Sequence, residues 1–310
     1  MRAASYDTFG GPEVLTVGER PDPPVGPDTV LVRARATSVN PVDWKIREGY
    51  LQGAYPHHLP IIPGWDVAGV VEAVGPSVRT GVQVGDEVWG YVRRDDVAHG
   101  TAAELVPAPE RTVAVKPPSL SFEEAASVPL AGLTAWQSLT EVLQVGPGDR
   151  VLVHAASGGV GQLAVQIAVA RGAEVIGTAS PAHHDLVREL GASVVLDHHA
   201  GPISEQLASH GGPVDAVLDL IGGDALADAA AQVKDPARLA SVIDPDTVIG
   251  LGGRYVFVRP DRDGLDALAA LVEEGRLRTT VARTFALDEI ADAHRLSEQG
   301  SPGGKIVVTI

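Results

Sequence analysis

The stretch VLVHAASGGVGQLAVQIA, residues 151–168, decides the fold of this 310-residue chain. It begins as a run of apolar residues typical of a buried strand, predicted at 150–156, and continues as a helix predicted at 160–171. Between them, Ala156, Gly158 and Gly161 occupy the positions of a G-x-G-x-x-G fingerprint, with alanine in the first. The first position needs a small residue for the turn, the second lets the backbone approach a pyrophosphate, and the third lets the helix pack closely on the strand.

This turn supplies the first candidate cofactor-binding residues. A helix that begins here leaves its first backbone N–H groups without intrahelical partners and points its positive dipole end at a phosphate. We therefore expect the pyrophosphate of a nicotinamide dinucleotide at Ala156, Ser157, Gly158, Gly159, Val160 and Gly161. A glycine-rich turn that holds no ligand is the alternative.

Strands and helices alternate beyond this unit. Further strands are predicted at 174–178, 194–197, 216–220, 239–243 and 255–258, with helical segments between most of them. Such alternation predicts a parallel sheet that is covered by helices on both faces.

The first ~120 residues differ, because short apolar runs alternate with Gly and Pro turns and helical periodicity is almost missing. This texture predicts a barrel-like or rolled β domain. A helix start follows at 119–126, with Ser121 as its N-cap. The last stretch, 286–310, predicts an amphipathic helix at 287–297 and a terminal strand at 306–310 that rejoins the first domain.

Composition limits the partners of the chain. Hydrophobic residues make up 45% and charged residues 21%, as in an ordinary globular protein. The formal net charge of −16 argues against nucleic acid or an anionic membrane as a partner, because both require clustered Lys and Arg. No apolar run approaches the ~18 residues of a membrane span. Cysteine is absent, which excludes disulfides and thiolate metal sites and agrees with a cytoplasmic location.

The end of the second predicted strand bears on the choice between NAD and NADP. NAD sites usually carry Asp or Glu there, which binds the ribose 2′-hydroxyl. Here the strand VIGTAS (175–180) ends at Ser180, and His183, His184 and His198 lie around the expected position. A hydroxyl and imidazoles can donate hydrogen bonds to a 2′-phosphate, so NADP is favoured. The alternative is that these histidines lie at a solvated helix start.

Seven further segments complete the pattern: FGGPEVL (9–15), SVNPVDWKIREG (38–49), IIPGWDVAGVVEAVG (61–75), VGDEVWGY (84–91), LAGLTAW (130–136), DLIGG (219–223) and GKIVV (304–308). With the glycine-rich turn they resemble the medium-chain dehydrogenase/reductase superfamily, and most closely its zinc-free quinone oxidoreductase branch, the ζ-crystallin-like proteins. The resemblance implies an α/β fold of two domains. A Rossmann NADP-binding domain spans 123–264, and a GroES-like, β-rich catalytic domain is built from both chain ends, 1–122 and 265–310.

Trp65 and Asp66 mark the departure from the zinc-dependent members of that superfamily. Those members resemble this stretch but read G-H-E, in which His binds the catalytic metal, and they place a Cys ligand near Asn40. A catalytic zinc site needs three protein ligands, and two are missing here, so no metal is expected. Trp65 is expected to fill the metal's volume and to wall the substrate pocket. Asp66 is expected to brace the turn by accepting backbone N–H groups, with a role as an acid as the alternative.

Without zinc, the alkoxide formed from a simple ketone would lack its Lewis acid. A conjugated acceptor is an easier target for hydride, because charge spreads to its carbonyl oxygen. The hypothesis is NADPH-dependent reduction of a quinone or an α,β-unsaturated carbonyl.

The resemblance also supplies catalytic candidates. Asn40 corresponds to the family's asparagine beside the nicotinamide, where its amide would bind a ribose hydroxyl or the substrate carbonyl; a turn residue before Pro41 is the alternative. Lys45 stands where many relatives have a tyrosine, and Tyr50 and Tyr91 are further candidates for the proton donor. Solvent is the alternative donor.

Further cofactor contacts are implied outside the glycine-rich turn. Thr134 resembles the threonine near the nicotinamide carboxamide, with a helix-capping residue as the alternative. Leu220 and Gly222, at the end of a strand, are expected to border the cofactor, and the Phe257 region is expected to offer backbone groups to the carboxamide.

Two function classes remain open at this point: an oxidoreductase, and a protein that holds NADPH as a sensor or structural protein without turnover. A homodimer is the family-level expectation, since pairing of the strand at 255–258 across a two-fold axis would cover its edge.

Overall fold

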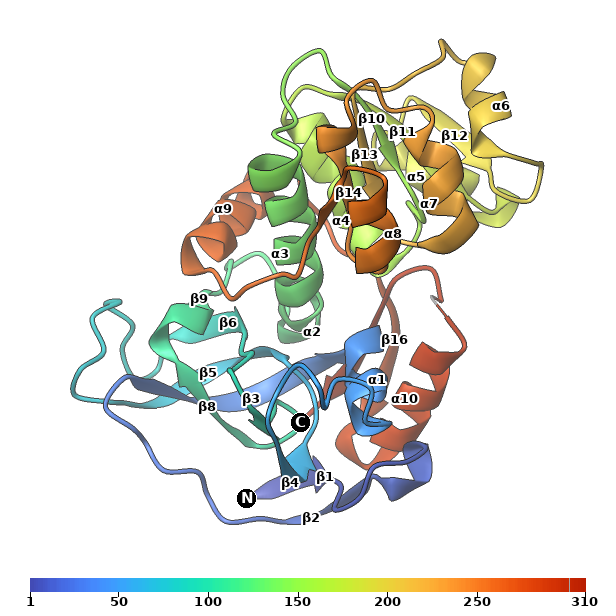
Figure 1. Ribbon diagram of the computed structural model, residues 1–310. Coiled ribbons are helices and arrows are strands. Elements are labelled where there is room, and N and C mark those ends of the chain that lie inside the picture. Colours follow the sequence, from blue (N-terminus) through green and yellow to red (C-terminus); the bar gives the residue numbers. More distant parts are fainter. Residues whose placement is uncertain (301) are drawn as a thin grey trace. The chain divides into compact units, whose positions relative to one another are not determined.

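A computed structural model describes residues 1–300 and 302–310 of the chain (Figure 1). The chain divides into two compact units. The first unit comprises Met1–Leu130, Arg259–Glu273 and Thr279–Ile310, and the second comprises Ala131–Val258 and Glu274–Arg278. Residues 123–130 and 259–264, which the sequence assigned to the nucleotide-binding domain, thus belong to the first unit.

The second unit is built on a six-stranded sheet in which every pair of neighbours is parallel. Its strands are, in spatial order, β12 (Val194–Asp197), β11 (Glu174–Ala179), β10 (Arg150–Val153), β13 (Ala216–Asp219), β14 (Leu239–Ser241) and β15 (Arg254–Tyr255). The chain runs from β10 outward to β12 and then returns to β13 on the other side of β10. This reversal is the topological switch point of a doubly wound sheet, where nucleotides bind.

Helices precede the first strand of this sheet along the chain and follow most of its strands. They are α3 (Pro129–Gln137, which begins in the first unit), the π-helical turn η3 (Ser138–Val142), α4 (Gly159–Ala170), η4 (Pro181–His183), α5 (His184–Glu189), α6 (Ile203–Ala208), α7 (Gly223–Ala230), η5 (Pro236–Arg238) and α8 (Pro245–Gly250). Apolar side chains of the strands pack against those of α6, α7 and α8, and Leu152, Ile176 and Leu226 are fully buried. This burial drives the layered packing.

The first unit holds a seven-stranded sheet. Its path is β16 (Val281–Ala286), β17 (Lys305–Thr309), β3 (Thr29–Val39), β5 (Asp66–Val74), β6 (Glu87–Tyr91) and β9 (Val113–Val115), and β8 (Leu105–Pro109) also pairs with β3. Two smaller pairs accompany it: β1 (Arg2–Ser5) with β2 (Thr16–Glu19), and β4 (His57–Ile62) with β7 (Val97–His99). Valines from β3, β5, β6, β8 and β9 form its core. The β-rich first domain predicted from the sequence is therefore present.

Short helices complete the first unit. They are η1 (Pro12–Val14), α1 (Pro41–Arg47), η2 (Glu110–Thr112), α2 (Phe122–Ala126), α9 (Arg262–Glu273), η6 (Leu287–Glu289) and α10 (Ile290–Glu298). Ser121 caps α2 as predicted, in a capping box with Glu124. The terminal strand β17 lies between β16 and β3, which confirms that the C-terminal stretch rejoins the first domain.

The strand predicted at 255–258 is shorter than expected. Only Arg254–Tyr255 forms β15, although the Val256 amide still donates to the Ser241 carbonyl at 2.9 Å. The physical reason is that β15 ends the sheet and its neighbour β14 is three residues long, so the ladder has no further residues to pair with.

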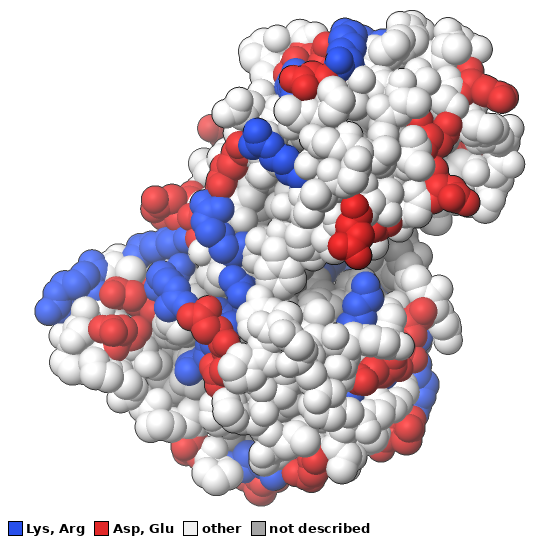
Figure 2. Space-filling model, in the orientation of Figure 1, with Lys and Arg blue, Asp and Glu red and all other residues white. Residues whose placement is uncertain are grey.

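Acidic and basic side chains are interspersed on the face shown in Figure 2, so the acidic excess is spread among basic groups there. Within the described part of the chain, no helix has the length and apolar character required to cross a membrane.

Candidate active site

The glycine-rich turn joins β10 to α4 in the second unit. Ala155 has a positive φ of 45°, and Gly158 is the N-cap of α4. A Cβ atom on Gly161 would lie 2.1 Å from the carbonyl oxygen of Ala155, so only glycine permits this approach of helix to strand. The packing role predicted for Gly161 is therefore confirmed. The tight turn at Ala156 is held by its amide, which donates to the Thr178 carbonyl at 2.9 Å.

The start of α4 fits a dinucleotide pyrophosphate. The helix runs for 12 residues, so Gly159, Val160 and Gly161 present first-turn N–H groups at the positive end of a full dipole. Ser157 is held beside them because the Gln162 side chain donates to its carbonyl at 2.7 Å.

The residues predicted around a 2′-phosphate gather at the end of β11. Ser180 Oγ lies 3.1 Å from His183 Nδ1, and His184 Nε2 lies 3.2 Å from the Ala179 carbonyl. His198 follows β12, which pairs with β11, and its ring centroid lies 4.0 Å from that of His199, with the two rings tilted by 44°. The structure thus brings a hydroxyl and imidazoles to the strand end.

The remaining predicted cofactor residues lie after the carboxyl ends of two strands and within a helix. Leu220 and Gly222 follow the carboxyl end of β13, and Gly222 has a φ of 79°, which glycine adopts readily. Phe257 follows β15 and is 42% exposed. Thr134 lies within α3 and is buried, so it is not at a helix cap.

In the first unit, Asp66 is a fully buried carboxylate with both oxygens occupied. Its Oδ1 accepts the Leu130 amide at 2.7 Å, and its Oδ2 accepts Ser38 Oγ at 2.6 Å and Asn40 Nδ2 at 2.8 Å. Burial raises the pKa of Asp66, while the Lys305 ammonium, with Nζ 3.9 Å from Oδ2, and these hydrogen bonds oppose the rise. Asp66 does accept a backbone amide, but that amide belongs to Leu130 and not to the turn at Pro63 and Gly64 that the carboxylate was expected to brace.

Asn40 uses both ends of its side-chain amide inside the first unit. Its Nδ2 donates to Asp66, and its Oδ1 accepts a short hydrogen bond from Lys305 Nζ. Both Asn40 and Lys305 are buried, and burial lowers the pKa of Lys305. In this arrangement the Asn40 amide is not offered to a ribose hydroxyl or a substrate carbonyl, so the contact inferred from the resemblance requires these bonds to be exchanged.

Asp43 is a second buried carboxylate in this cluster. Its Oδ2 accepts the Asn40 amide at 2.7 Å and completes a capping box at the start of α1. Burial raises the pKa of Asp43 to about 7, with Asp66 adding to the rise and Lys305 opposing it. Asp43 is therefore partly protonated near neutral pH.

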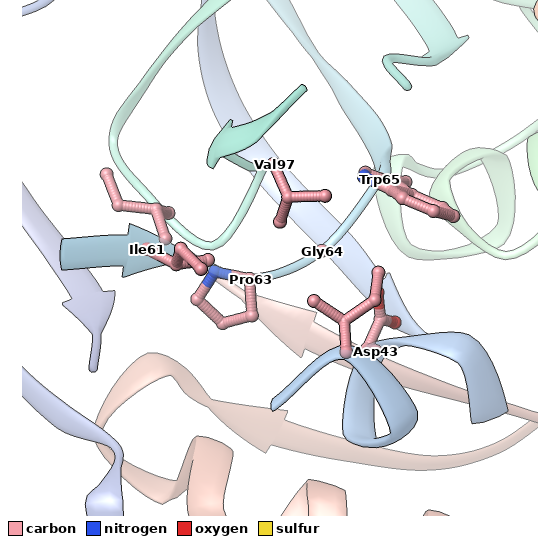
Figure 3. Close-up of a pocket in the computed structure, with 8 residues that line it drawn as sticks. Asp43, Ile61, Pro63, Gly64, Trp65 and Val97 are labelled. Atoms are coloured by element: carbon pink, nitrogen blue, oxygen red, sulfur yellow. The ribbon is translucent and has the colours of Figure 1, made fainter. Parts of the chain in front are cut away.

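Trp65 lies in an aromatic cluster. Its ring centroid is 5.9 Å from that of Tyr91 and 6.5 Å from that of Tyr55, both edge-on. Figure 3 shows Trp65, Asp43 and Val97 around the turn at Pro63 and Gly64. The small cavity that they help to line measures about 10 Å³, roughly one water molecule. Trp65 is 6% exposed and is therefore packed in the interior, and the cavity beside it is too small for a quinone.

The candidates for a proton donor differ in accessibility. Tyr91 is fully buried, burial raises its pKa well above the ordinary value, and its hydroxyl has no hydrogen-bond partner in residues 1–300 and 302–310. Tyr50 is 69% exposed and contacts Trp44 edge-on at 6.3 Å. Lys45 Nζ lies 5.6 Å from the centre of the Trp44 ring. Tyr50 and Lys45 reach solvent, and Tyr91 does not.

Within the described residues, no three His, Cys, Asp or Glu side chains are placed so that they could hold a metal ion.

Sequence reasoning assigned no role to Ser38, Asp43 or Lys305, although each lies in the buried cluster around Asp66. All three stand in segments that carried the resemblance, SVNPVDWKIREG and GKIVV. A signal existed for two of them, since Asp43 and Lys305 are charged residues within apolar segments.

Comparison with known families gives two matches. The family described as alcohol dehydrogenase GroES-like domain matches residues 26–118, and the family described as zinc-binding dehydrogenase matches residues 190–308.

Individual relatives match along the whole chain. NAD(P)H oxidoreductase RTN4IP1, mitochondrial, of Mus musculus is 32% identical over 100% of this chain and 89% of its own length. Quinone-oxidoreductase QR1, chloroplastic, of Triphysaria versicolor is 32% identical, covering 99% of this chain and 98% of its own. The 2-methylene-furan-3-one reductase of Solanum lycopersicum is 33% identical, covering 99% and 79%.

Solved structures match equally completely. The quinone oxidoreductase from Coxiella burnetii superposes with a TM-score of 0.90 at 35% identity, covering 100% of this chain and 99% of its own. An NAD-dependent alcohol dehydrogenase superposes with a TM-score of 0.88 at 33% identity, covering 100% of both chains. With its GroES-like unit, its Rossmann unit and these relatives, the chain belongs to the medium-chain dehydrogenase/reductase superfamily, in the branch of the quinone oxidoreductases.

Proposed function

We propose that this oxidoreductase uses NADPH, without zinc, to deliver hydride to a quinone or an α,β-unsaturated carbonyl. The coarser activity, that of an NAD(P)H oxidoreductase of the medium-chain type, follows from the family. The finer proposal names the cofactor, the metal independence and the acceptor class.

The observation that carries the proposal is the set of hydrogen bonds that Asp66 accepts, together with its place directly after Trp65. This carboxylate follows the position where zinc-dependent relatives carry a histidine ligand, and here that position is Trp65. Both Asp66 oxygens already accept hydrogen bonds, from Leu130 on one side and from Ser38 and Asn40 on the other. A carboxylate with this set of donors, beside an indole that cannot bind zinc, is a poor start for a three-ligand metal site.

The chemistry follows from the missing Lewis acid. Reduced nicotinamide, when bound, supplies the hydride. A conjugated acceptor spreads the resulting negative charge onto its oxygen, where hydrogen-bond donors and water suffice to stabilise it. The oxygen anion then takes a proton. We assign that proton to solvent. Tyr91 is fully buried and out of contact with water, and Tyr50 is largely exposed to it.

NADPH is proposed over NADH because of the groups at the end of β11. Ser180 and His183 lie 3.1 Å apart, and His184 is adjacent, so hydrogen-bond donors rather than a carboxylate stand at the strand end. The names of the relatives support the acceptor class, since they include a quinone oxidoreductase and a reductase of a methylene-furanone.

Steady-state turnover tests this proposal. Purified protein is assayed for NADPH and NADH oxidation with 1,4-benzoquinone, 9,10-phenanthrenequinone and a panel of enones, with and without EDTA and 1,10-phenanthroline. We expect acceptor-dependent oxidation of NADPH that both chelators leave unchanged.

Three results would each overturn part of the proposal. Alcohol oxidation that a chelator abolishes would establish a zinc enzyme. A preference for NADH would refute the cofactor assignment. Tight NADPH binding without acceptor-dependent oxidation would favour a sensor instead.

We further propose a homodimer in the cytoplasm. The relatives above carry mitochondrial and chloroplastic in their names, so the location is tested directly by fractionation of the source cells, where recovery with an organelle or membrane would contradict it.

A further inference from the structure

His154 is a buried histidine between β10 and the glycine-rich turn, and the proposed function gives it no role. It is 1% exposed, and its Nδ1 lies 2.8 Å from Asp219 Oδ1 at the end of the neighbouring strand β13. Its Nε2 is buried without a hydrogen-bond partner in the described part of the chain. The tautomer that satisfies the contact carries its hydrogen on Nδ1 and donates it to the carboxylate.

The Asp219 carboxylate accepts hydrogen bonds from three segments of the chain. Besides His154, it accepts Ser241 Oγ at 2.7 Å from the end of β14. It also accepts the backbone amides of Ile221 at 3.2 Å and Gly222 at 3.0 Å. Burial alone would raise the pKa of Asp219, but the hydrogen bonds from His154 and Ser241 outweigh it, so the pKa lies below its usual value. The carboxylate is thus ionised and fixes the turn that follows β13.

Ser241 extends the same network to the next turn. Its Oγ accepts the amides of Ile243 and Asp244, each at 3.2 Å. Asp244 Oδ2 in turn accepts the Gly223 amide at 3.0 Å, which ties the second turn back to the first. One chain of hydrogen bonds therefore runs beneath the ends of β10, β13 and β14.

The two turns held in this way expose apolar side chains. Ile221 is 54% exposed and Ile243 is 46% exposed, although the network beneath them is buried. Both follow the carboxyl ends of their strands, the edge at which ligands bind in parallel sheets. In the order of the sheet they lie on one side of β10, and Ser180, after β11, lies on the other.

We propose that His154, Asp219 and Ser241 are positioning residues that hold the turns at 221–222 and 243–244 as a platform for the nicotinamide half of the dinucleotide. This inference rests on the proposed function, because it assumes that the cofactor crosses the glycine-rich turn with its adenosine half toward Ser180. The nicotinamide half then extends over β13 and β14, where Ile221 and Ile243 offer apolar surface. His154 acts through Asp219 and touches no reacting atom.

Calorimetric titration of His154→Leu tests the inference. Wild-type protein is first titrated with NADPH and NADH, and the tighter of the two is used together with its adenosine half, 2′,5′-ADP or 5′-AMP. Loss of a buried hydrogen bond to a carboxylate predicts that this variant binds the dinucleotide roughly 10-fold or more weakly than wild type does. The affinity for the adenosine half should stay within about 2-fold, because that half does not reach the platform.

His154→Asn is the conservative variant. Its amide nitrogen stands close to the position of Nδ1 and can still donate to Asp219, so its dinucleotide affinity should lie within about 3-fold of wild type. His210→Leu is the matched control, because His210 lies in the same unit near the amino end of β10, where its carbonyl accepts from Arg150. Ser241→Ala should weaken the dinucleotide as well. Ser241 and His154 both donate to one carboxylate, so their effects should not be independent. The double variant of Ser241→Ala and His154→Leu should bind the dinucleotide less tightly than the product of the two single losses predicts.

Each contrary result has a distinct meaning. If His154→Leu binds the dinucleotide as wild type does, or loses both ligands equally, or if His154→Asn is as weak as His154→Leu, the positioning role is refuted while the proposed function stands. If wild-type protein binds neither dinucleotide, the proposed function fails and the inference fails with it.

Discussion

Asp66 illustrates how much a single buried residue can decide. A carboxylate that is removed from water must be neutralised or hydrogen-bonded, and this one finds Leu130, Ser38 and Asn40 as donors, with the Lys305 ammonium nearby. Those donors are the hydroxyl of Ser38, the side-chain amide of Asn40 and the backbone amide of Leu130, which lie 26 to 64 positions from Asp66 in the sequence. Replacing Asp66 would leave all three without this acceptor inside the unit, so its first role is to hold the end of β3, the start of β5 and the first turn of α3 together.

Ser180 allows a test at the same scale. Exchange of Ser180 for Asp places a negative charge at the end of β11, where the 2′-phosphate of NADPH is expected. Repulsion of about 1–3 kcal/mol between these groups predicts roughly 10- to 100-fold weaker NADPH binding. NADH should change by about 3-fold or less, because its ribose hydroxyl can donate to the new carboxylate.

Dissociation constants for both cofactors, from fluorescence titration, give the measurement. Ser180→Ala is the control, since it removes the hydroxyl without adding charge and should cost NADPH only about 3-fold. Equal losses of NADPH and NADH in Ser180→Asp would contradict the assignment of the 2′-phosphate site.

At the scale of elements, α1 and α10 lie side by side although the chain between them spans most of the protein (Figure 1). Arg47 of α1 is fully buried and donates to the Gly10 carbonyl at 2.9 Å and to Glu298 of α10 at 2.5 Å. Its Nη1 lies 3.0 Å from His294 Nδ1, so the imidazole must be the acceptor and therefore neutral. One guanidinium thus joins two helices from opposite ends of the chain.

This junction predicts a pH dependence of stability. Burial, with the Arg47 charge adding to it, lowers the pKa of His294 from 6.5 to about 3. Between these two pH values the imidazole binds a proton in the unfolded chain but not in the folded chain. The contribution of His294 to stability is therefore fully present above about pH 6.5 and is lost as the pH falls toward 3. His294→Asn keeps an acceptor for Arg47 but cannot titrate. As the pH falls, the free energy of unfolding of this variant should therefore decrease less steeply than that of wild type. The two slopes should differ by up to about 1.4 kcal/mol per pH unit.

Urea unfolding at pH 7.5, 6.5, 5.5 and 4.5 checks this expectation. Asp43, whose pKa is raised from 3.8 to about 7, gives stability an opposite trend of similar size, but it is common to both proteins and cancels in the comparison. His58→Asn, at an exposed position of β4, is the matched control and should follow wild type. Parallel curves for wild type and His294→Asn would show that the Arg47–His294 contact does not govern acid stability.

At the scale of the whole molecule, the sheet of the second unit has an edge strand with apolar surface beside it. The second unit's sheet ends at β15, a two-residue strand beside α8, where Ile249 is 62% and Leu251 is 36% exposed. Apolar surface next to a terminal strand is typical of a surface that another subunit covers. These observations favour a two-fold contact at β15 and α8.

We therefore expect a solution mass about twice the chain's 32.1 kDa by light scattering. Ile249→Arg places a charge in the expected contact and should shift the protein toward monomer at low micromolar concentration. Val84→Arg is the control, because Val84 is 66% exposed in the first unit and the substitution should leave the mass unchanged. A monomeric wild type would refute the dimer.

Much of this architecture could be predicted from the sequence. Gly161 had to be glycine because a Cβ atom would meet the Ala155 carbonyl, and that local requirement can be read from the spacing of the glycines. Ser121 could be identified as a cap for the same reason, since capping depends on residues three apart. The strand at 255–258 was overestimated because its length depends on β14, a partner that local sequence does not reveal.

The sequence by itself determined the alternation of strands and helices, the position of the nucleotide turn, and the presence of Trp65 where zinc-dependent relatives carry a histidine ligand. These features depend on backbone conformation and residue type within short segments. Only the tertiary structure decided that Lys305 and Asp43 lie in the same buried cluster as Asp66. It also decided that the Asn40 side chain hydrogen-bonds both Lys305 and Asp66, and that His154 hydrogen-bonds Asp219. The physical reason is that a buried polar group must find its partner wherever the fold places one, and such partners lie as many as 265 positions apart in this chain.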